Sequence, residues 1–73
     1  MSDIPSIRLV AARVNAGMNQ DDVASELGVS KATIVSWEYG KTEPTISQAR
    51  HMARLFNFPL DKIIFSIDES ISN

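Results

Sequence analysis

The stretch from Asn19 to Tyr39 constrains the fold of this chain more than any other. Its apolar residues follow helical spacing on both sides of Gly28, which predicts two short helices separated by a tight turn. Glycine adopts the left-handed backbone conformation at little steric cost, so Gly28 marks the end of the first helix. Asn19 and Ser30 carry side-chain oxygens that can cap the two helix starts. These signals describe a helix-turn-helix, whose second helix can enter a DNA major groove.

The second helix of this unit has two chemically different faces. Ile34 and Trp37 share one face, which we assign to the core. The opposite face is small and lightly polar, and it consists of Lys31, Ala32, Val35, Ser36 and Tyr39. Helices that meet only water tend to carry longer polar side chains, so Ala32 and Val35 favour a contact surface over a solvated one.

Two spaced patterns carry a family resemblance. The first is Q-x-x-x-A-x-x-L-G-V-S from Gln20 to Ser30, and the second is I-x-x-W-E-x-G-K-x-x-P from Ile34 to Pro44. Further matching positions are Arg13, Gly17, Ala53 and Asp61. With these residues the chain resembles the Cro/C1-type (XRE) helix-turn-helix proteins, which include lambdoid phage repressors and Cro. The resemblance extends over residues 7–65 and implies a lambda-repressor-like DNA-binding domain.

The length of 73 residues indicates one domain with a marginal core. We expect residues 1–6 to be an N-terminal segment, residues 7–65 to form the helix-turn-helix domain, and residues 66–73 to be a short tail that adds to a dimer contact. The predicted fold is all-α, a compact five-helix bundle, and the length predicts a complete protein of Cro size. The chain contains no cysteine, so oligomerisation or tight helical packing must supply its stability.

The first predicted helix covers residues 7–16, begins at a cap provided by Asp3 or Ser6, and is closed by Gly17. It has two apolar stripes. One stripe contains Ile7, Val10, Ala11 and Val14, and the other contains Leu9, Ala12, Arg13 and Ala16. The family resemblance favours the second stripe as the core face, which would leave Val10 and Val14 partly exposed.

The last two predicted helices follow the loop that ends at Pro44. Thr45 opens the fourth helix with Gln48 three residues later, a capping-box pattern, and Asn57 ends it. Its predicted core face is Ile46, Ala49, Met52, Ala53 and Phe56. A short fifth helix is expected to follow Pro59.

The charge balance is unusual for a nucleic-acid-binding protein. Seven Lys/Arg residues against nine Asp/Glu residues give a net charge of -2, whereas such domains are usually basic. Only the face that meets the phosphates must be positive, so DNA binding is still possible if the Lys and Arg side chains lie on that face and the carboxylates lie elsewhere. We therefore predict modest affinity for a monomer and a need for dimers. The chain has no apolar run of membrane-spanning length and no signal peptide, so we expect no membrane association and a cytoplasmic location.

The predicted site residues fall into three groups. Base readout is assigned to Lys31, Ala32, Val35 and Ser36, with Lys31 suited to guanine O6 and N7 and Ala32 to a thymine methyl group. Phosphate contact is assigned to Asn19, Gln20, Ser30, Thr33, Lys41 and Thr42. Asn19 serves equally well as a helix cap or a phosphate donor, whereas for Gln20 the family resemblance favours DNA contact. The resemblance further implies a structural salt bridge between Arg13 and Glu38.

The expected function is a sequence-specific DNA-binding transcriptional regulator, of which the family resemblance favours a Cro/C1-type repressor. Members of this family usually bind near-palindromic operators as homodimers, with half-sites about one helical turn apart, roughly 34 Å. The expected dimer contact is Phe58, Ile64, Phe65 and Ile67. The alternatives are a protein-binding module, such as the antitoxin of a toxin–antitoxin pair, and a restriction–modification controller or activator. One histidine, no cysteine and no phosphate-binding loop argue against an enzyme, a metal site or a cofactor.

Overall fold

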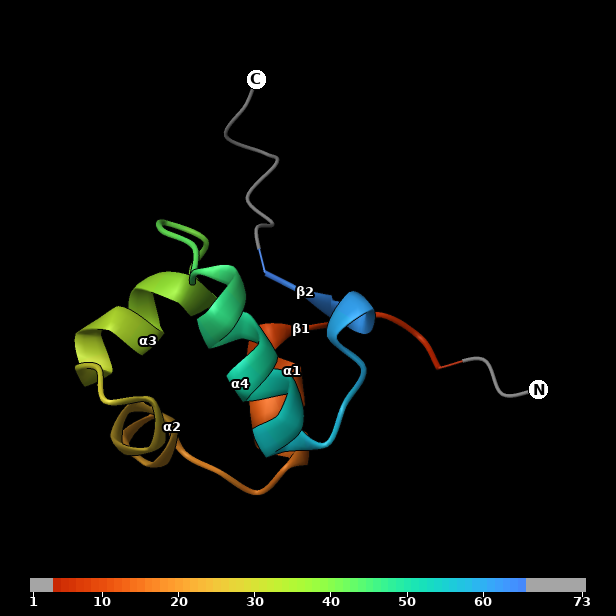
Figure 1. Ribbon diagram of the computed structural model, residues 1–73, viewed down its shortest axis with the longest axis horizontal. Helices are drawn as coiled ribbons and strands as arrows, with labels where there is room; N and C mark the ends of the chain where they lie inside the picture. The colour runs from red at the N-terminus through yellow and green to blue at the C-terminus, as the bar shows by residue number, and fades with distance from the viewer. Residues whose placement is uncertain (1–3, 66–73) are drawn as a thin grey trace.

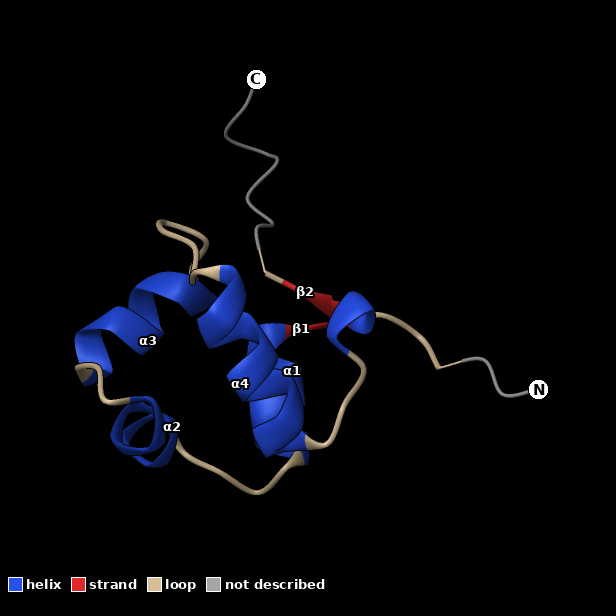
Figure 2. Cartoon of the chain, in the orientation of Figure 1, coloured by secondary structure: helices blue, strands red, loops and turns tan. Residues whose placement is uncertain are grey.

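Residues 4–65 are described by a computed structural model, in which helices form most of the chain (Figures 1 and 2). In chain order the elements are β1 (Ile7–Arg8), α1 (Leu9–Asn15), α2 (Gln20–Leu27), α3 (Lys31–Glu38), α4 (Ile46–Phe56), the 3-10 helix η1 (Leu60–Lys62) and β2 (Ile63–Ile64). Figure 1 shows α2 and α3 at one end of the molecule and the strands with η1 at the other. Within residues 4–65, no helix is both long enough and apolar enough to cross a bilayer.

The predicted caps at the starts of α2, α3 and α4 are confirmed. Asn19 Oδ1 accepts a hydrogen bond from the backbone N–H of Asp22 at 2.7 Å, and the Asp22 carboxylate accepts one from the backbone N–H of Asn19 at 2.9 Å. Thr45 and Gln48 form the same reciprocal capping box at α4. Ser30 Oγ accepts the backbone N–H of the third residue of α3 at 3.1 Å. Each cap satisfies N–H groups that the first helical turn leaves without a partner.

The α-helices in residues 4–65 all end in the same way. The residue after the last turn adopts a left-handed backbone conformation, and the next N–H reaches back to a carbonyl five residues earlier, which is the Schellman motif. The left-handed residues are Gly17 (φ 75°), Gly28 (φ 71°), Gly40 (φ 77°) and Asn57 (φ 54°). The returning bonds join Met18 to Arg13, Val29 to Ala24, Lys41 to Ser36 and Phe58 to Ala53. These ends turn the chain sharply, so short helices can surround one core.

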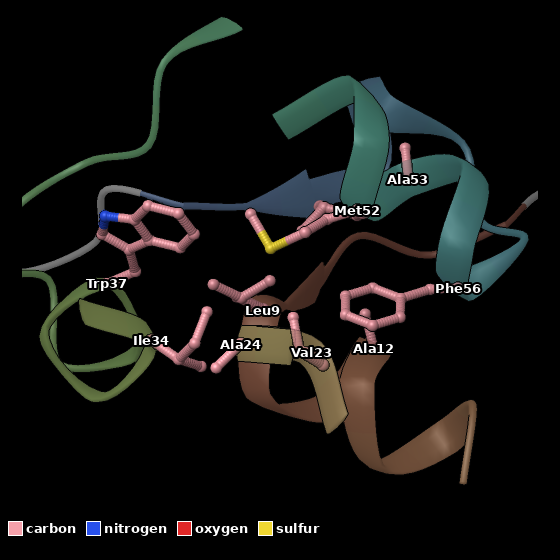
Figure 3. Close-up of a cluster of buried hydrophobic side chains, with 10 residues drawn as sticks. Leu9, Ala12, Val23, Ala24, Ile34, Trp37, Met52, Ala53 and Phe56 are labelled. Carbon is pink, nitrogen blue, oxygen red and sulfur yellow. The ribbon is translucent and has the colours of Figure 1, made fainter. Parts of the chain in front are cut away.

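The core contains side chains from every α-helix and from β2 (Figure 3). Its buried members are Leu9, Ala12, Val23, Ala24, Ile34, Trp37, Met52, Ala53, Phe56 and Ile63. Leu9 and Ala12 are 3% and 1% exposed, whereas Val10 and Val14 are 36% and 61% exposed. The stripe of the first helix that the family resemblance favoured is therefore the core face.

The prediction of a five-helix bundle is wrong, although the domain is helical in its architecture. Four α-helices are present in residues 4–65, and the expected fifth helix is one turn of 3-10 helix followed by a strand. The first helix begins at Leu9, because Ile7 and Arg8 pair in parallel with Ile63 and Ile64. These positions are rich in isoleucine, whose β-branched side chain favours extended backbone once a partner strand is available.

Two smaller expectations also need correction. Arg8 occupies the N-cap position of α1 without a side-chain hydrogen bond, so Ser6 does not cap this helix, and Asp3 lies outside the described residues. Ile46, predicted to be in the core, is 67% exposed. It is the first residue of α4, and helical spacing gives a direction around the axis without telling how far along the axis the neighbouring helices extend. The buried stripe begins one turn later, at Ala49.

Truncation of two large apolar residues in α4 should have very different effects. Met52 is fully buried, so Met52→Ala should lower the free energy of unfolding by about 2–5 kcal/mol. Ile46→Ala, in the same helix, should change it by less than about 0.5 kcal/mol because the side chain is 67% exposed. Urea unfolding followed by circular dichroism measures both. Equal losses from the two variants would contradict the burial described above.

Candidate nucleic-acid interface

The turn between α2 and α3 is set by Gly28. Its φ of 71° lies in the left-handed region, and a Cβ built on it would meet no atom within 4 Å. The requirement for glycine is therefore conformational and does not come from crowding. Val29 follows and packs partly against the core, and Ser30 then caps α3. This short connection fixes the direction in which α3 leaves α2.

The outward face of α3 lies clear of the core, as the sequence predicted. Lys31 and Ala32 are exposed, and Val35 and Ser36 are half-buried. The opposite face holds Ile34 and Trp37, whose exposed fractions are 1% and 3%. In Figure 3 both of these side chains point into the cluster formed with Leu9 and Met52. Two deeply buried anchors thus hold the helix while its small side chains face outward. Tyr39, at the C-cap, is 67% exposed.

Hydroxyl pairs flank the outward face of α3. Ser36 Oγ lies 2.8 Å from Thr42 Oγ1, and Ser30 Oγ lies 3.0 Å from Thr33 Oγ1. The sequence predicts DNA contact for each of these residues separately and gives no sign of the pairs. The spacing of six residues between Ser36 and Thr42 carries no helical signal, because a left-handed turn lies between them. Lys41, next to Thr42, is exposed.

Asn19 and Gln20 are both engaged in hydrogen bonds within the protein. The backbone N–H and the Oδ1 atom of Asn19 belong to the capping box, which leaves its Nδ2 atom as the side-chain donor for a phosphate. Gln20 Nε2 donates to Glu38 Oε1 at 2.9 Å. An amide nitrogen carries two hydrogens, so Gln20 retains one for an external acceptor. The helix cap and the phosphate contact are thus chemically compatible at Asn19.

An ion pair joins α1 to the end of α3. Arg13 Nε donates to Glu38 Oε2 at 2.6 Å, and the two side chains are 12% and 8% exposed. Arg13 Nη1 also donates to the carbonyl oxygen of Met18 at 2.9 Å. With the bond from Gln20, this network ties α1, α2 and α3 together around one carboxylate. The Gln20–Glu38 bond spans 18 residues, and no local pattern in the sequence predicts it.

The residues expected at a dimer contact do not share one environment. Ile64, in β2, is 39% exposed. Phe58 and Phe65 are half-buried and pack against the core, so the domain already covers part of each ring. Ile67 lies outside the described residues. The apolar surface that remains available near β2 is therefore centred on Ile64.

Comparison with known proteins agrees with a helix-turn-helix architecture. The profile of a family described as helix-turn-helix matches residues 9–63, most of the chain. The chain belongs to the Cro/C1-type helix-turn-helix family. An uncharacterised HTH-type transcriptional regulator of Archaeoglobus fulgidus is 34% identical over 64 residues, which cover 88% of this chain and 91% of the relative. A second such regulator, from Methanocaldococcus jannaschii, is 35% identical over 52 residues, or 71% and 79% of the two chains.

A further relative in this helix-turn-helix family has a more specific name. The cryptic phage CTXphi transcriptional repressor RstR of Vibrio cholerae is 27% identical over 59 residues, which cover 81% of this chain and 53% of RstR. The family is one of DNA-binding transcriptional regulators, and the unit formed by α2 and α3 is its helix-turn-helix.

The ion pair leads to a prediction about stability. Arg13→Met should destabilise the domain by roughly 3–5 kcal/mol, because it leaves the Glu38 carboxylate largely buried without its cation. The double variant Arg13→Met/Glu38→Leu should lose less than the single variant, because no buried charge remains. Urea unfolding of the parent and both variants measures the difference. A double variant that is less stable than Arg13→Met would contradict this account.

Proposed function

We propose that this protein is a sequence-specific transcriptional repressor of Cro/C1 type that binds its operator through the outward face of α3. The observation that carries the proposal is the division of α3 into a buried face anchored by Ile34 and Trp37 and an outward face of small side chains. A helix must approach base edges closely to read them, and small side chains permit that approach. Membership of the helix-turn-helix family supports the same conclusion.

In this proposal the residues divide into two chemical roles. Lys31 donates to guanine at the start of α3, and Ala32 and Val35 make apolar contacts with thymine methyl groups. Ser36 adds a single hydroxyl. The side chains expected to hold the phosphates are Asn19, Gln20, Ser30, Thr33, Lys41 and Thr42, which lie around the ends of α2 and α3. Few base hydrogen bonds are available on this face, so DNA shape contributes to specificity.

The net acidity of the chain is compatible with this role because only the surface that meets the phosphates must be positive. The Glu38 carboxylate at the end of α3 is compensated by its ion pair with Arg13. Lys31 and Lys41 are exposed near the outward face of α3. The local charge that a phosphate meets there is therefore more favourable than the net charge of the chain suggests.

Repression and a homodimer are the finer parts of the proposal. A domain that only occupies an operator can exclude polymerase without further machinery, and the similarity to RstR, named as a phage repressor, favours repression over activation. A homodimer would double the readout on near-palindromic half-sites about one helical turn apart. The expected contact is centred on Ile64, with Phe58, Phe65 and Ile67 contributing.

Duplex binding tests the main proposal. The affinity for a selected duplex should fall steeply as salt rises, because cationic side chains displace counterions from the phosphates. Lys31→Glu should weaken binding by roughly 5- to 150-fold, since a contact of this kind is worth about 1–3 kcal/mol. Lys62→Glu reverses a charge on η1, at the other end of the molecule, and should leave affinity nearly unchanged (Figure 1). Fluorescence anisotropy measures the affinities, and thermal melts check the folding of both variants. Equal affinity of the parent and Lys31→Glu would refute the proposal.

A charge placed at the expected dimer contact tests the homodimer. Ile64→Glu should shift the protein toward monomer and reduce operator affinity, because it puts a carboxylate into an apolar contact. Ile46→Glu is the matched control for the association state, since Ile46 is also exposed and lies in a different element of the fold. Sedimentation equilibrium at micromolar concentration, with and without duplex, measures the association state. A parent protein that stays monomeric in both conditions would rule out the dimer.

A protein-binding module is the second candidate, and one observation favours it. Val10 and Tyr39 are exposed and line a hollow together with Arg13, Gln20 and Glu38. Val14, on the same helix as Val10, is 61% exposed. Exposed apolar side chains of this kind suit a protein partner, such as the toxin of a toxin–antitoxin pair. The salt titration separates the candidates, because a purely protein-binding module would not bind duplex DNA even at low salt.

A further inference from the structure

The hydrogen bond between Ser36 and Thr42 joins a residue expected to face bases to one expected to face a phosphate. Ser36 Oγ and Thr42 Oγ1 are 2.8 Å apart. The bond is held by the Schellman end of α3, where Gly40 adopts φ 77° and the backbone N–H of Lys41 donates to the carbonyl oxygen of Ser36 at 3.0 Å. The loop thereby turns back beside Ser36. The end of the helix therefore brings the backbone of Thr42 close enough to Ser36 for the two hydroxyl groups to meet.

A hydroxyl group has one hydrogen to donate and two lone pairs that accept. A bond between two hydroxyls uses one of the two hydrogens, so it has two directions. If Thr42 donates, Ser36 keeps its hydrogen and can donate to a base. If Ser36 donates, Ser36 can only accept from a base, while Thr42 keeps its hydrogen for another acceptor. Either direction is compatible with the observed geometry.

A bound phosphate removes this ambiguity. Phosphate oxygens in DNA accept hydrogen bonds and have no hydrogen to donate, so Thr42 can bind one only by donating. Thr42 must then accept from Ser36, and the hydrogen of Ser36 is used. The exposed ammonium of Lys41, the adjacent residue, favours a phosphate at this position.

We propose that Thr42 sets the base preference of Ser36 through the direction of this hydrogen bond. The inference rests on the proposed function, because it takes Ser36 to meet a base and Thr42 a phosphate. With its hydrogen committed to Thr42, Ser36 presents lone pairs to the major groove. The bases that offer a donor there are adenine, through its N6 amino group, and cytosine, through its N4 amino group. Guanine and thymine offer only acceptors to a hydroxyl at this position and are disfavoured.

Selection of bound sequences from a random duplex pool tests the inference with the full chain. The position read by Ser36 is the one whose preference disappears in Ser36→Ala. At this position the parent should enrich adenine or cytosine over guanine or thymine by about tenfold. Thr42→Val keeps the shape of the side chain and removes the hydroxyl, so Ser36 regains its hydrogen and the enrichment should fall to about twofold or less. Thr42→Ser should retain the preference of the parent.

Thr33→Val is the matched control, because it removes a hydroxyl of the other pair on α3, 3.0 Å from Ser30 Oγ. It should lower affinity for all sequences alike and leave the preference at the Ser36 position intact. A parent that prefers guanine or thymine there would overturn the inference, as would a Thr42→Val variant with the preference of the parent. A Ser36→Ala variant that changes no position would also overturn it. If no duplex is enriched by the folded parent, the proposed function fails and the inference with it.

Discussion

The burial of Ile34 and Trp37 is the interaction on which the rest of this structure depends. An isolated helix of eight residues is not stable in water, because the cost of nucleation is not recovered over two turns. The two side chains are 1% and 3% exposed, and burying side chains of this size contributes roughly 1.5–3 kcal/mol each. Without that contribution α3 would have no fixed orientation. With it, one face of the helix is held while the other remains open to the outside.

Polar groups also hold α3 in place, in addition to the buried side chains of Ile34 and Trp37. Glu38 lies at the end of the helix and receives hydrogen bonds from Arg13 on α1 and Gln20 on α2. A carboxylate that is only 8% exposed needs such partners, because a buried charge without them is strongly unfavourable. The same bonds determine where Gln20 stands at the start of α2. Stability and the geometry of the candidate interface are therefore supported by the same carboxylate.

The way in which the helices end explains how so small a domain encloses a core. Gly17, Gly28, Gly40 and Asn57 turn the chain sharply at the helix ends, so that the helices can fold back onto one core. At Gly40 this turn also brings Thr42 close to Ser36. The motif that ends α3 therefore also positions two side chains at the candidate interface. The parallel pair β1–β2 joins the two ends of the described chain at the opposite side of the molecule (Figure 1). The surface centred on Ile64 and the outward face of α3 thus belong to different elements of the fold.

The sequence by itself determined the local features of this protein. Asn19, Ser30 and Thr45 cap their helices through bonds that span three residues, and helical spacing identifies Ile34 and Trp37 as one face. Such features depend only on residues within one or two helical turns, so local patterns in the sequence are enough to predict them. The roles of the outward residues in DNA contact remain predictions.

Only the tertiary structure decided the features that join distant parts of the chain. Residues 7 and 8 could extend a helix or form a strand, and pairing with Ile63 and Ile64 made them a strand. The exposure of Ile46 and the bond from Gln20 to Glu38 depend on where other helices end. The physical reason is the same in each case. The periodicity of the sequence gives the direction in which a side chain points from the axis of its helix or strand, and only the packed fold determines which residues lie in that direction.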